Sequence, residues 1–436
     1  MKLRVLLLAL SAHAVGVNAA NLMTVIDSAI QHDADLAQAR AGYEAAQQAV
    51  PKARAALLPK LSAGWGRAYN RTATDGLPTA DYWQNGWTVG LSQPLFDWTS
   101  WTSYKQADLI VARGAVDLAD AQQATILRAA RNYFEALSAE DELKRATDYA
   151  SAVASHLEVL RRQQAAGEAT VIDLDEAESV GQQAILQQMD AQNELRLKYL
   201  AVEQATGVPL TFLSALPDTA IRPTLEPRDA ERWVTEARSQ NYAVQRQQIQ
   251  LRIAELEVGK LRSEHYPVIG LTANHTPAGA AAGYSQPAST TTAMLTITVP
   301  LFNGGETHAR HKEAVALEHK AQAELLSASR QAEAATRDHF SRFRWSLART
   351  DRLAQLVATS HKALESTRIG FKVSGRTSGD VLRAVDQLYA NQQSLMRARY
   401  ESLMSLLELK AETGTLDLNE VAQVNALLTP GGPVSQ

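Results

Sequence analysis

Residues 85–97 read NGWTVGLSQPLFD, and two different patterns meet in them. Up to Pro94 the apolar residues Trp87, Val89 and Leu91 alternate with small or polar ones. Beyond Asp97 a run of about 70 residues is dense in Ala, Gln, Glu, Arg and Leu, which are strong helix formers. The stretch therefore predicts a strand with one apolar and one polar face that leads directly into a long helix.

Three other short segments show the same alternation. They are KLSAGWGRAYN at 60–70, PVIGLTANH at 267–275 and AMLTITVP at 293–300. The loops between the paired segments are rich in Gly, Pro and Thr, which is typical of exposed turns. We therefore expect two β-hairpins, at about 60–94 and about 267–300. Each strand has about the length that a tilted transmembrane strand requires.

Long helix-forming segments occupy most of the remaining chain. Helices of about 68 residues would run to roughly 100 Å, which favours coiled-coil or bundle packing over a globule. The segments are about 22–57, 98–165, 173–206, 229–262, 307–373 and 380–412.

The chain repeats itself with a period of about 208 residues. Pro94-Leu95-Phe96-Asp97 matches residues 300–303, and Thr206-Gly207 matches Thr413-Gly414. We expect a first repeat at 20–215 and a second at 216–418, each with a helix, a hairpin and a long helix pair. A flexible C-terminal tail is expected at 419–436.

Each long helix pair is expected to turn at a glycine. The turns lie near Gly167 and Gly375, and the residues after them match in the two repeats. In this alignment Thr170 corresponds to Ser378, and Leu174 to Leu382. We predict that these turns form the tips of the two helix pairs.

Composition excludes several classes of site. The 436 residues contain no cysteine, which excludes disulfides, thiolate metal sites and a cysteine nucleophile. A formal net charge of −4 provides no basic field for nucleic acid. No metal-ligand or catalytic spacing was found, so no cofactor and no metal are expected, and the protein is predicted not to be an enzyme.

The first 19 residues have the order of a secretory signal peptide. Lys2 and Arg4 precede an apolar run at 5–17, and small residues follow it. Past this segment no apolar stretch approaches the roughly 20 residues of a spanning helix. The mature chain is therefore predicted to be exported, and any membrane crossing would use strands.

Four strands are too few to close a barrel, and open edges are excluded in lipid. If the strands enter a membrane, several chains must share one barrel, and three chains would supply twelve strands. The alternative is a soluble β-sandwich fed by helices.

Four segments of the sequence resemble those of a known family. AALLPKLSAGWG at 55–66, QPLFD at 93–97, VPLFNGG at 299–305 and the segment 374–417 resemble the TolC family of outer-membrane channel-tunnels. The resemblance implies a mixed α+β membrane protein: a homotrimer with a twelve-stranded β-barrel in the outer membrane of a Gram-negative bacterium, and an α-helical coiled-coil tunnel through the periplasm. It also implies a passive duct that docks on a periplasmic membrane-fusion adaptor and an inner-membrane transporter.

The last segment resembles the branch of the family that serves type I secretion with an ABC transporter. Three alternatives stay open. They are the outer-membrane component of a proton-driven drug or metal efflux pump, a periplasmic coiled-coil adaptor, and a secreted enzyme.

The resemblance also implies a gate at the tips, the periplasmic entrance. Arg376 stands at the position of the family's gate arginine, and Asp173 matches an aspartate that receives it. Phe371 stands where related channels carry a tyrosine, and a phenyl ring lacks the hydroxyl for that hydrogen bond. The alternative for Arg376 and Asp173 is ordinary surface charge near turns.

In SGRTSGDVLRAVDQLY, residues 374–389, the charged residues Asp380, Arg383 and Asp386 recur at intervals of three and share a helix face. Asp380 matches the first aspartate of the family's constriction, whereas Arg383 replaces an expected second one. In a trimer this stripe would form charged rings, and Arg383 would weaken cation selectivity. The alternative is a solvated helix face with local ion pairs.

Aromatic residues concentrate in the first hairpin. Trp65, Trp83 and Trp87 are predicted to lie where a barrel meets lipid headgroups. The alternative is ordinary packing in a hairpin-to-helix junction.

Overall fold

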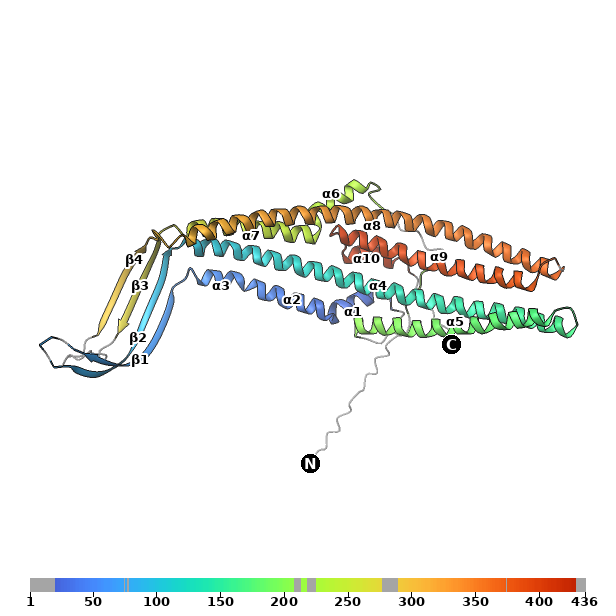
Figure 1. The fold of residues 1–436 in the computed structure, drawn as a ribbon, viewed down its shortest axis with the longest axis horizontal. Helices are drawn as coiled ribbons and strands as arrows, with labels where there is room; N and C mark the ends of the chain where they lie inside the picture. The colour runs from blue at the N-terminus through green and yellow to red at the C-terminus, as the bar shows by residue number, and fades with distance from the viewer. Residues whose placement is uncertain are drawn as a thin grey trace, which may run out of the picture. The chain divides into compact units, whose positions relative to one another are not determined.

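The structure is a computed structural model that describes residues 20–73, 75–76, 78–207, 213–217, 225–276, 289–373 and 375–428. The predicted signal peptide, residue 374 and most of the second hairpin's loop lie outside these ranges. The chain forms two compact units. Figure 1 labels the helices and strands. The first comprises Met1–Ala37, Ala121–Asn241 and Glu333–Gln436, and the second comprises Gln38–Asp120 and Tyr242–Ala332.

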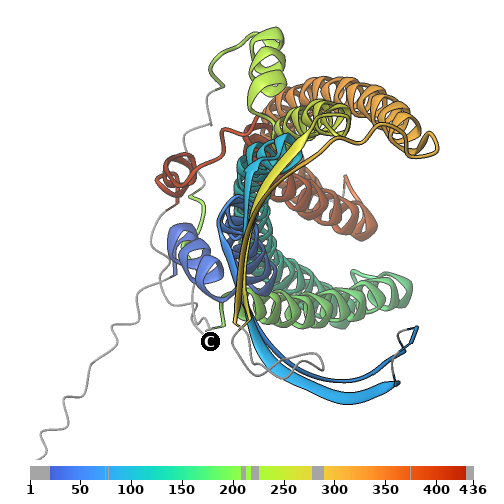
Figure 2. The same ribbon diagram turned by 90° about the vertical axis from the view of Figure 1, so that its left-hand side faces the viewer.

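The second unit contains one antiparallel sheet with the strand order β1-β2-β3-β4. Its strands are β1 (Lys60–Thr72), β2 (Ala80–Phe96), β3 (Val268–Thr276) and β4 (Thr290–Thr298). Both expected hairpins are therefore present. Figure 2 shows that the β1–β2 hairpin bends along its length.

The strand register gathers the apolar side chains on one face of the sheet. Leu61 lies opposite Leu91, Trp65 opposite Trp87, and Leu271 opposite Leu295. Since alternate residues point to opposite faces, this pairing joins the apolar sides of all four strands. The opposite face carries mainly Ser, Thr, Gly and Asn.

Helices α2 (Ala34–Gln47), α3 (Ala49–Ala55) and α7 (Tyr242–Ser263) belong mainly to the second unit, which also holds the first part of α4 (Trp98–Ala165). A Cβ on Gly114 of α4 would lie 2.9 Å from the Cβ of Ala46. The absence of a side chain there lets α2 approach α4 closely.

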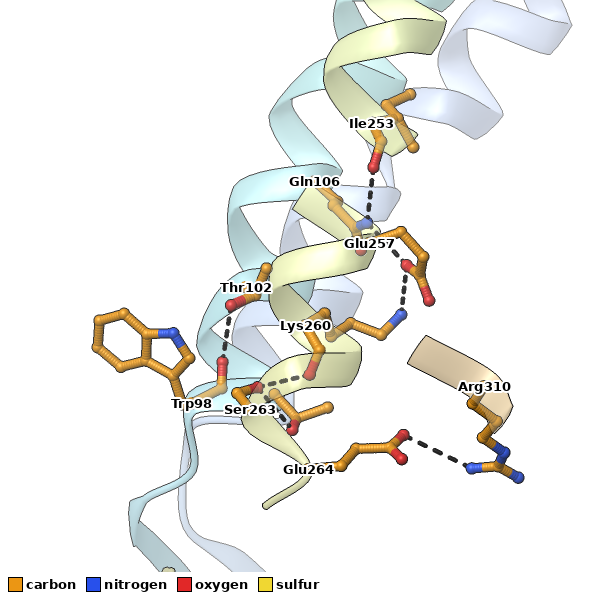
Figure 3. A network of polar contacts seen from close by, with 10 residues as sticks. Trp98, Thr102, Gln106, Ile253, Glu257, Lys260, Ser263, Glu264 and Arg310 are labelled. Atoms are coloured by element: carbon orange, nitrogen blue, oxygen red, sulfur yellow. Dashed lines mark hydrogen bonds and ion pairs between the residues drawn. The ribbon is translucent and has the colours of Figure 1, made fainter. Parts of the chain in front are cut away.

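Polar bonds fasten α7 to α4 beside the sheet (Figure 3). The Gln106 amide donates to the Ile253 carbonyl at 3.2 Å and to Glu257 at 2.8 Å. The hydroxyls of Thr99 and Ser263 lie 3.3 Å apart. Because α4 follows β2 and α7 precedes β3, these bonds hold the inner strands' helical ends together.

The first unit contains α1 (Leu22–His32), α5 (Val171–Thr206), α6 (Ala230–Gln240), α9 (Ser378–Glu412), α10 (Leu418–Asn425) and the later parts of α4 and α8 (Glu306–Lys372). Its main core surrounds the fully buried Tyr133 and Phe343. Tyr133 donates its hydroxyl to the Ser214 carbonyl at 2.7 Å. Within the described ranges, no helix combines the length and the apolar composition that crossing a bilayer requires.

The expected flexible tail is wrong for its first part. Asp417 caps the start of α10, accepting the N–H of Glu420 at 2.9 Å. Val421 and Val424 are buried in the main core, which explains why this segment is ordered. Residues 429–436 lie outside the described ranges.

The sequence repeats do not coincide with the compact units. Each unit takes segments from both repeats, and α4 and α8 contribute residues to both units. The two repeats therefore contribute corresponding elements to the same units and do not form separate domains.

Candidate functional site

The first helix tip, between α4 and α5, is shaped by Gly167. Its φ of +79° lies in the left-handed region that favours glycine, and the N–H of Glu168 donates to the Gln163 carbonyl at 2.8 Å. Thr170 and Asp173 then form a capping box. The N–H of Asp173 donates to Thr170 Oγ1 at 3.1 Å, and the N–H of Thr170 donates to Asp173 Oδ2 at 3.2 Å.

The second tip, between α8 and α9, has the same kind of capping box. The N–H of Asp380 donates to Thr377 Oγ1 at 3.2 Å, and the N–H of Thr377 donates to Asp380 Oδ2 at 3.0 Å. The partner of Thr170 in the repeat is therefore Thr377, and the expected alignment with Ser378 is wrong by one residue. Thr170 and Thr377 are separated by the same number of residues as Thr206 and Thr413. The two repeats therefore align without a gap from the tip to the end of the following helix.

Arg376 lies against the last turn of α8. A Cβ on Gly370 would meet the Arg376 Cγ at 2.9 Å, so the arginine stem occupies the space that Gly370 leaves. The N–H of Gly375 donates to the Gly370 carbonyl at 2.8 Å and closes this turn. Among the described residues, Arg376 makes no hydrogen bond or ion pair, and within one chain it does not reach Asp173.

The charged stripe on α9 divides into two parts. Arg383 donates to Asp380 at 2.7 Å, whereas Asp386 accepts a long contact of 3.5 Å from the Tyr149 hydroxyl of α4. The pKa of the Asp380 carboxyl is lowered to about 2, first by the N–H of Thr377 and then by the Arg383 guanidinium. At neutral pH Asp380 is therefore ionised, and its charge is already shared between a helix cap and an arginine.

The predicted aromatic residues of the first hairpin lie on the apolar face of the sheet. Trp65, Trp83 and Trp87 are 69%, 58% and 49% exposed in the single chain. Trp83 contacts the ring of Tyr69, with 5.2 Å between ring centroids. The Arg67 guanidinium lies 4.3 Å from the centroid of Trp83.

The family model described as outer membrane efflux protein matches residues 25–208 and 233–415, which is most of the chain and both repeats. The chain belongs to this family.

Individual relatives of this efflux family agree over nearly the whole length. The chain is 28% identical to the outer membrane protein TolC of Vibrio cholerae serotype O1 over 414 residues, covering 94% of both chains. It is 28% identical to the proteases secretion protein PrtF of Dickeya chrysanthemi, covering 95% of this chain and 92% of PrtF. A crystal structure of CusC superposes with a TM-score of 0.81 at 17% identity, covering 90% of this chain and 92% of that one.

These findings confirm the fold class and the general function expected from the sequence. The chain is an efflux-family channel of the Gram-negative outer membrane, serving type I secretion or efflux, with four strands and long helices per chain.

One tip contact of this efflux-family chain was missed by sequence reasoning. His156 of α4 has its Nε2 3.0 Å from the Ser378 hydroxyl at the start of α9. Its ring also packs edge-on against Phe371, with 5.4 Å between centroids. Burial lowers the pKa of His156, and the positive charge of Arg368 lowers it further. No local signal marks His156, because it is a lone histidine within a helical run.

Phe371 therefore has a defined role in the structure. Its ring packs on the ring of His156, with 5.4 Å between centroids. Next to it, helices α4, α5, α8 and α9 share a core that includes Val153, Ala177, Leu364 and Val385. The two tips are thus parts of one packed body, and Glu176 of α5 places its carboxylate oxygens 3.8 Å from the position that a Cβ on Gly379 would occupy.

Proposed function

We propose that this chain forms the passive outer-membrane duct of a tripartite type I protein secretion system. The observation that carries the proposal is the hairpin and long helix pair present twice in one family-matched chain. Similarity over nearly full length to a protein named for protease secretion supports the secretion branch. The partners would be a periplasmic membrane-fusion adaptor and an inner-membrane ABC transporter, which supplies the energy.

The duct would be a homotrimer. In one chain β1 and β4 form the two edges of the sheet, and lipid does not tolerate open edges. Three chains would pair these edges and close a twelve-stranded barrel, an even number within the known range. The apolar face of the sheet would then contact lipid, and the face rich in Ser, Thr, Gly and Asn would line the lumen.

The protein would perform no chemistry of its own. Transport through it would be driven by the transporter, and its contribution would be a continuous polar path and an entrance that opens and closes. We assign no catalytic residue, cofactor or metal to it.

The entrance would lie at the two tips, with Arg376 as its closing residue. The Arg376 guanidinium has no partner among the described residues of its own chain and is exposed. Asp173 uses Oδ2 in its capping box, and its Oδ1 accepts no hydrogen bond among the described residues. An Arg376 to Asp173 pair between neighbouring chains would therefore be compatible with both helix caps.

Single-channel conductance in planar bilayers tests this proposal. Wild type should show a small conductance, and Arg376→Ala should raise it severalfold. Lys372→Ala removes another exposed cation from the same tip and should leave the conductance unchanged. Absence of any channel from folded protein would contradict the duct. Equal conductance in wild type and Arg376→Ala would retain the duct and exclude Arg376 as its gate.

A second candidate is the outer-membrane component of a proton-driven drug or metal efflux pump, which the family name favours. Cells that lack the chain would distinguish the two systems. Loss of a secreted protein from the medium, with unchanged drug and metal tolerance, would support type I secretion. The reverse result would support efflux.

A further inference from the structure

One surface of the first hairpin is not explained by transport. It consists of Trp65, Arg67, Tyr69, Trp83 and Trp87, and we name it the aromatic–arginine ladder. The first three residues alternate along β1, so their side chains share a face with Leu61 and Ala63. Trp65 lies opposite Trp87 and Tyr69 opposite Trp83, so β2 continues the same face.

The position of the ladder follows from the length of β2. Trp87 and Phe96 are nine residues apart, about 31 Å along an antiparallel strand. A tilt of 35–45° reduces this to roughly 22–25 Å, which matches the apolar band of about 25 Å in outer-membrane barrels. Phe96 is also followed by Trp98, whose ring centroid lies 6.5 Å from that of Phe96. Aromatic residues therefore bound the apolar band at both ends, and the Trp65 and Trp87 pair marks its outer boundary.

Arg67 lies immediately beyond that boundary. It is two residues past Trp65, a rise of about 7 Å along the strand, and therefore at the height of lipid headgroups. Its side chain is on the lipid side of the sheet and not on the luminal side, since it shares the parity of Trp65 and Tyr69. A cation in this place faces lipid headgroups.

The guanidinium of Arg67 is held in place by an aromatic ring. It lies 4.3 Å from the centroid of Trp83, within the range of a cation–π contact. Among the residues that the structure describes, Arg67 has no carboxylate partner, whereas Arg71 pairs with Asp81 at 3.4 Å. Stacking on Trp83 leaves the planar N–H groups at the edge of Arg67 available, and these groups match two phosphate oxygens at once.

We propose that the aromatic–arginine ladder binds a phosphate group of lipopolysaccharide, the phosphorylated glycolipid of the outer leaflet. Arg67 donates to the phosphate, Trp83 orients the guanidinium, and Trp65 and Trp87 contact the upper part of the acyl chains. The inference rests on the outer-membrane placement and is independent of the gate. A failure of Arg376 to control conductance would leave it intact.

Native mass spectrometry of the purified, detergent-solubilised assembly tests the proposal, with bisphosphorylated lipid A as the probe. Wild type should retain the probe, and Arg67→Gln should bind it about tenfold more weakly, since a charge-assisted contact is lost. Lipid A without phosphates should bind wild type as weakly as the phosphorylated form binds Arg67→Gln. Trp83→Leu, which keeps an apolar side chain, should give an intermediate loss.

Lys60→Gln is the matched control, because it removes an equal charge from the opposite end of β1. It should bind lipid A like wild type, and circular dichroism should show that all variants are folded. Unchanged binding by Arg67→Gln, or an equal loss in Lys60→Gln, would overturn the proposal. Binding of inorganic pyrophosphate as tight as that of lipid A would also overturn it, because the site would then recognise a free anion and not a lipid.

Discussion

The carboxylate of Asp380 accepts a hydrogen bond from the backbone N–H of Thr377 at 3.0 Å, and Asp173 makes the equivalent bond with Thr170 at the other tip. The sequence predicts a place for Asp380 in the constriction, and in the structure its carboxylate completes the capping box at the start of α9. Asp173 likewise carries a charge at its tip and completes the capping box of α5. A substitution of either aspartate would therefore alter charge and helix start together, and the two effects need separate variants.

Thr377→Ala separates them, because it removes half of the capping box and keeps the Asp380 charge. Loss of a Thr cap costs about 1 kcal/mol, and the first turn of α9 should fray. Amide hydrogen exchange of residues 378–381 should accelerate by roughly fivefold, and ion selectivity should stay at the wild-type value. Thr170→Ala should produce the same acceleration in α5 only. Exchange at the wild-type rate in both variants would show that these caps do not stabilise the tips.

Arg383→Asp tests the charge of the stripe. In wild type Arg383 pairs with Asp380 and reduces the net negative charge of that face. Replacing it by aspartate should make a trimeric pore clearly more cation-selective, with Arg383→Gln intermediate. The reversal potential in a salt gradient measures this order. A wild-type pore that is strongly cation-selective and unchanged in Arg383→Asp would show that the stripe does not face the pore.

His156 should make the second tip sensitive to acid. Its folded pKa lies below the ordinary value of about 6.5, so an unfolded tip binds a proton more readily than the folded one. The contribution of His156 to the stability of the tip is therefore fully present above its ordinary pKa. It decreases as the pH falls from about 6.5 towards the pKa of the folded state. Hydrogen exchange around Phe371 and Ser378, corrected for intrinsic rates, should be faster at about pH 5 than at about pH 7.5.

His156→Gln provides the control for this pH dependence. Glutamine can still hydrogen-bond to Ser378 and does not titrate. The corrected exchange rates of this variant should be the same at both pH values. A variant that kept the full acid effect would assign it to another group.

Tyr400→Phe tests a buried bond between α9 and α4. The Tyr400 hydroxyl donates to Asp141 at 2.6 Å, and burial together with the negative charge of Asp141 raises the pKa of Tyr400. Removing the hydroxyl deprives a charged acceptor of a donor and should cost about 1–3 kcal/mol. The thermal midpoint of the helical circular dichroism signal should fall. Tyr389→Phe, which loses a bond of 3.2 Å to the Asp148 carbonyl at a half-buried site, should lower it less.

Gly414→Ala should damage the first unit more than other glycine substitutions. Gly414 has a φ of +70°, and a Cβ there would lie 2.2 Å from the Gln240 carbonyl oxygen. The added methyl group therefore meets backbone that cannot move without displacing the end of α6. Low yield of folded protein, or a large fall in Tm, is expected. Gly42→Ala in α2 has nothing within 4 Å and should raise Tm slightly.

Local patterns in the sequence predicted the main elements well. The alternation of apolar and polar residues around Trp87 and Leu91 predicted the position of β2, and the same pattern predicted its partner β1. Period-two alternation reflects the geometry of a strand itself. The helix α10 was missed although Asp417 and Glu420 form a local start signal, with Asp417 three residues before Glu420. The one-residue error at the second tip had the same origin, since Thr377 and Asp380 form a Thr-x-x-Asp cap that could have aligned it with Thr170 and Asp173.

The sequence by itself determined the order of strands and long helices, the duplication, the two tip turns and the family. These features depend on neighbours within a few residues and on matches along the chain. Only the tertiary structure decided that His156 meets Ser378 and that Tyr400 meets Asp141. Contacts between residues more than 200 positions apart depend on the rotation and packing of whole helices, which local periodicity does not encode.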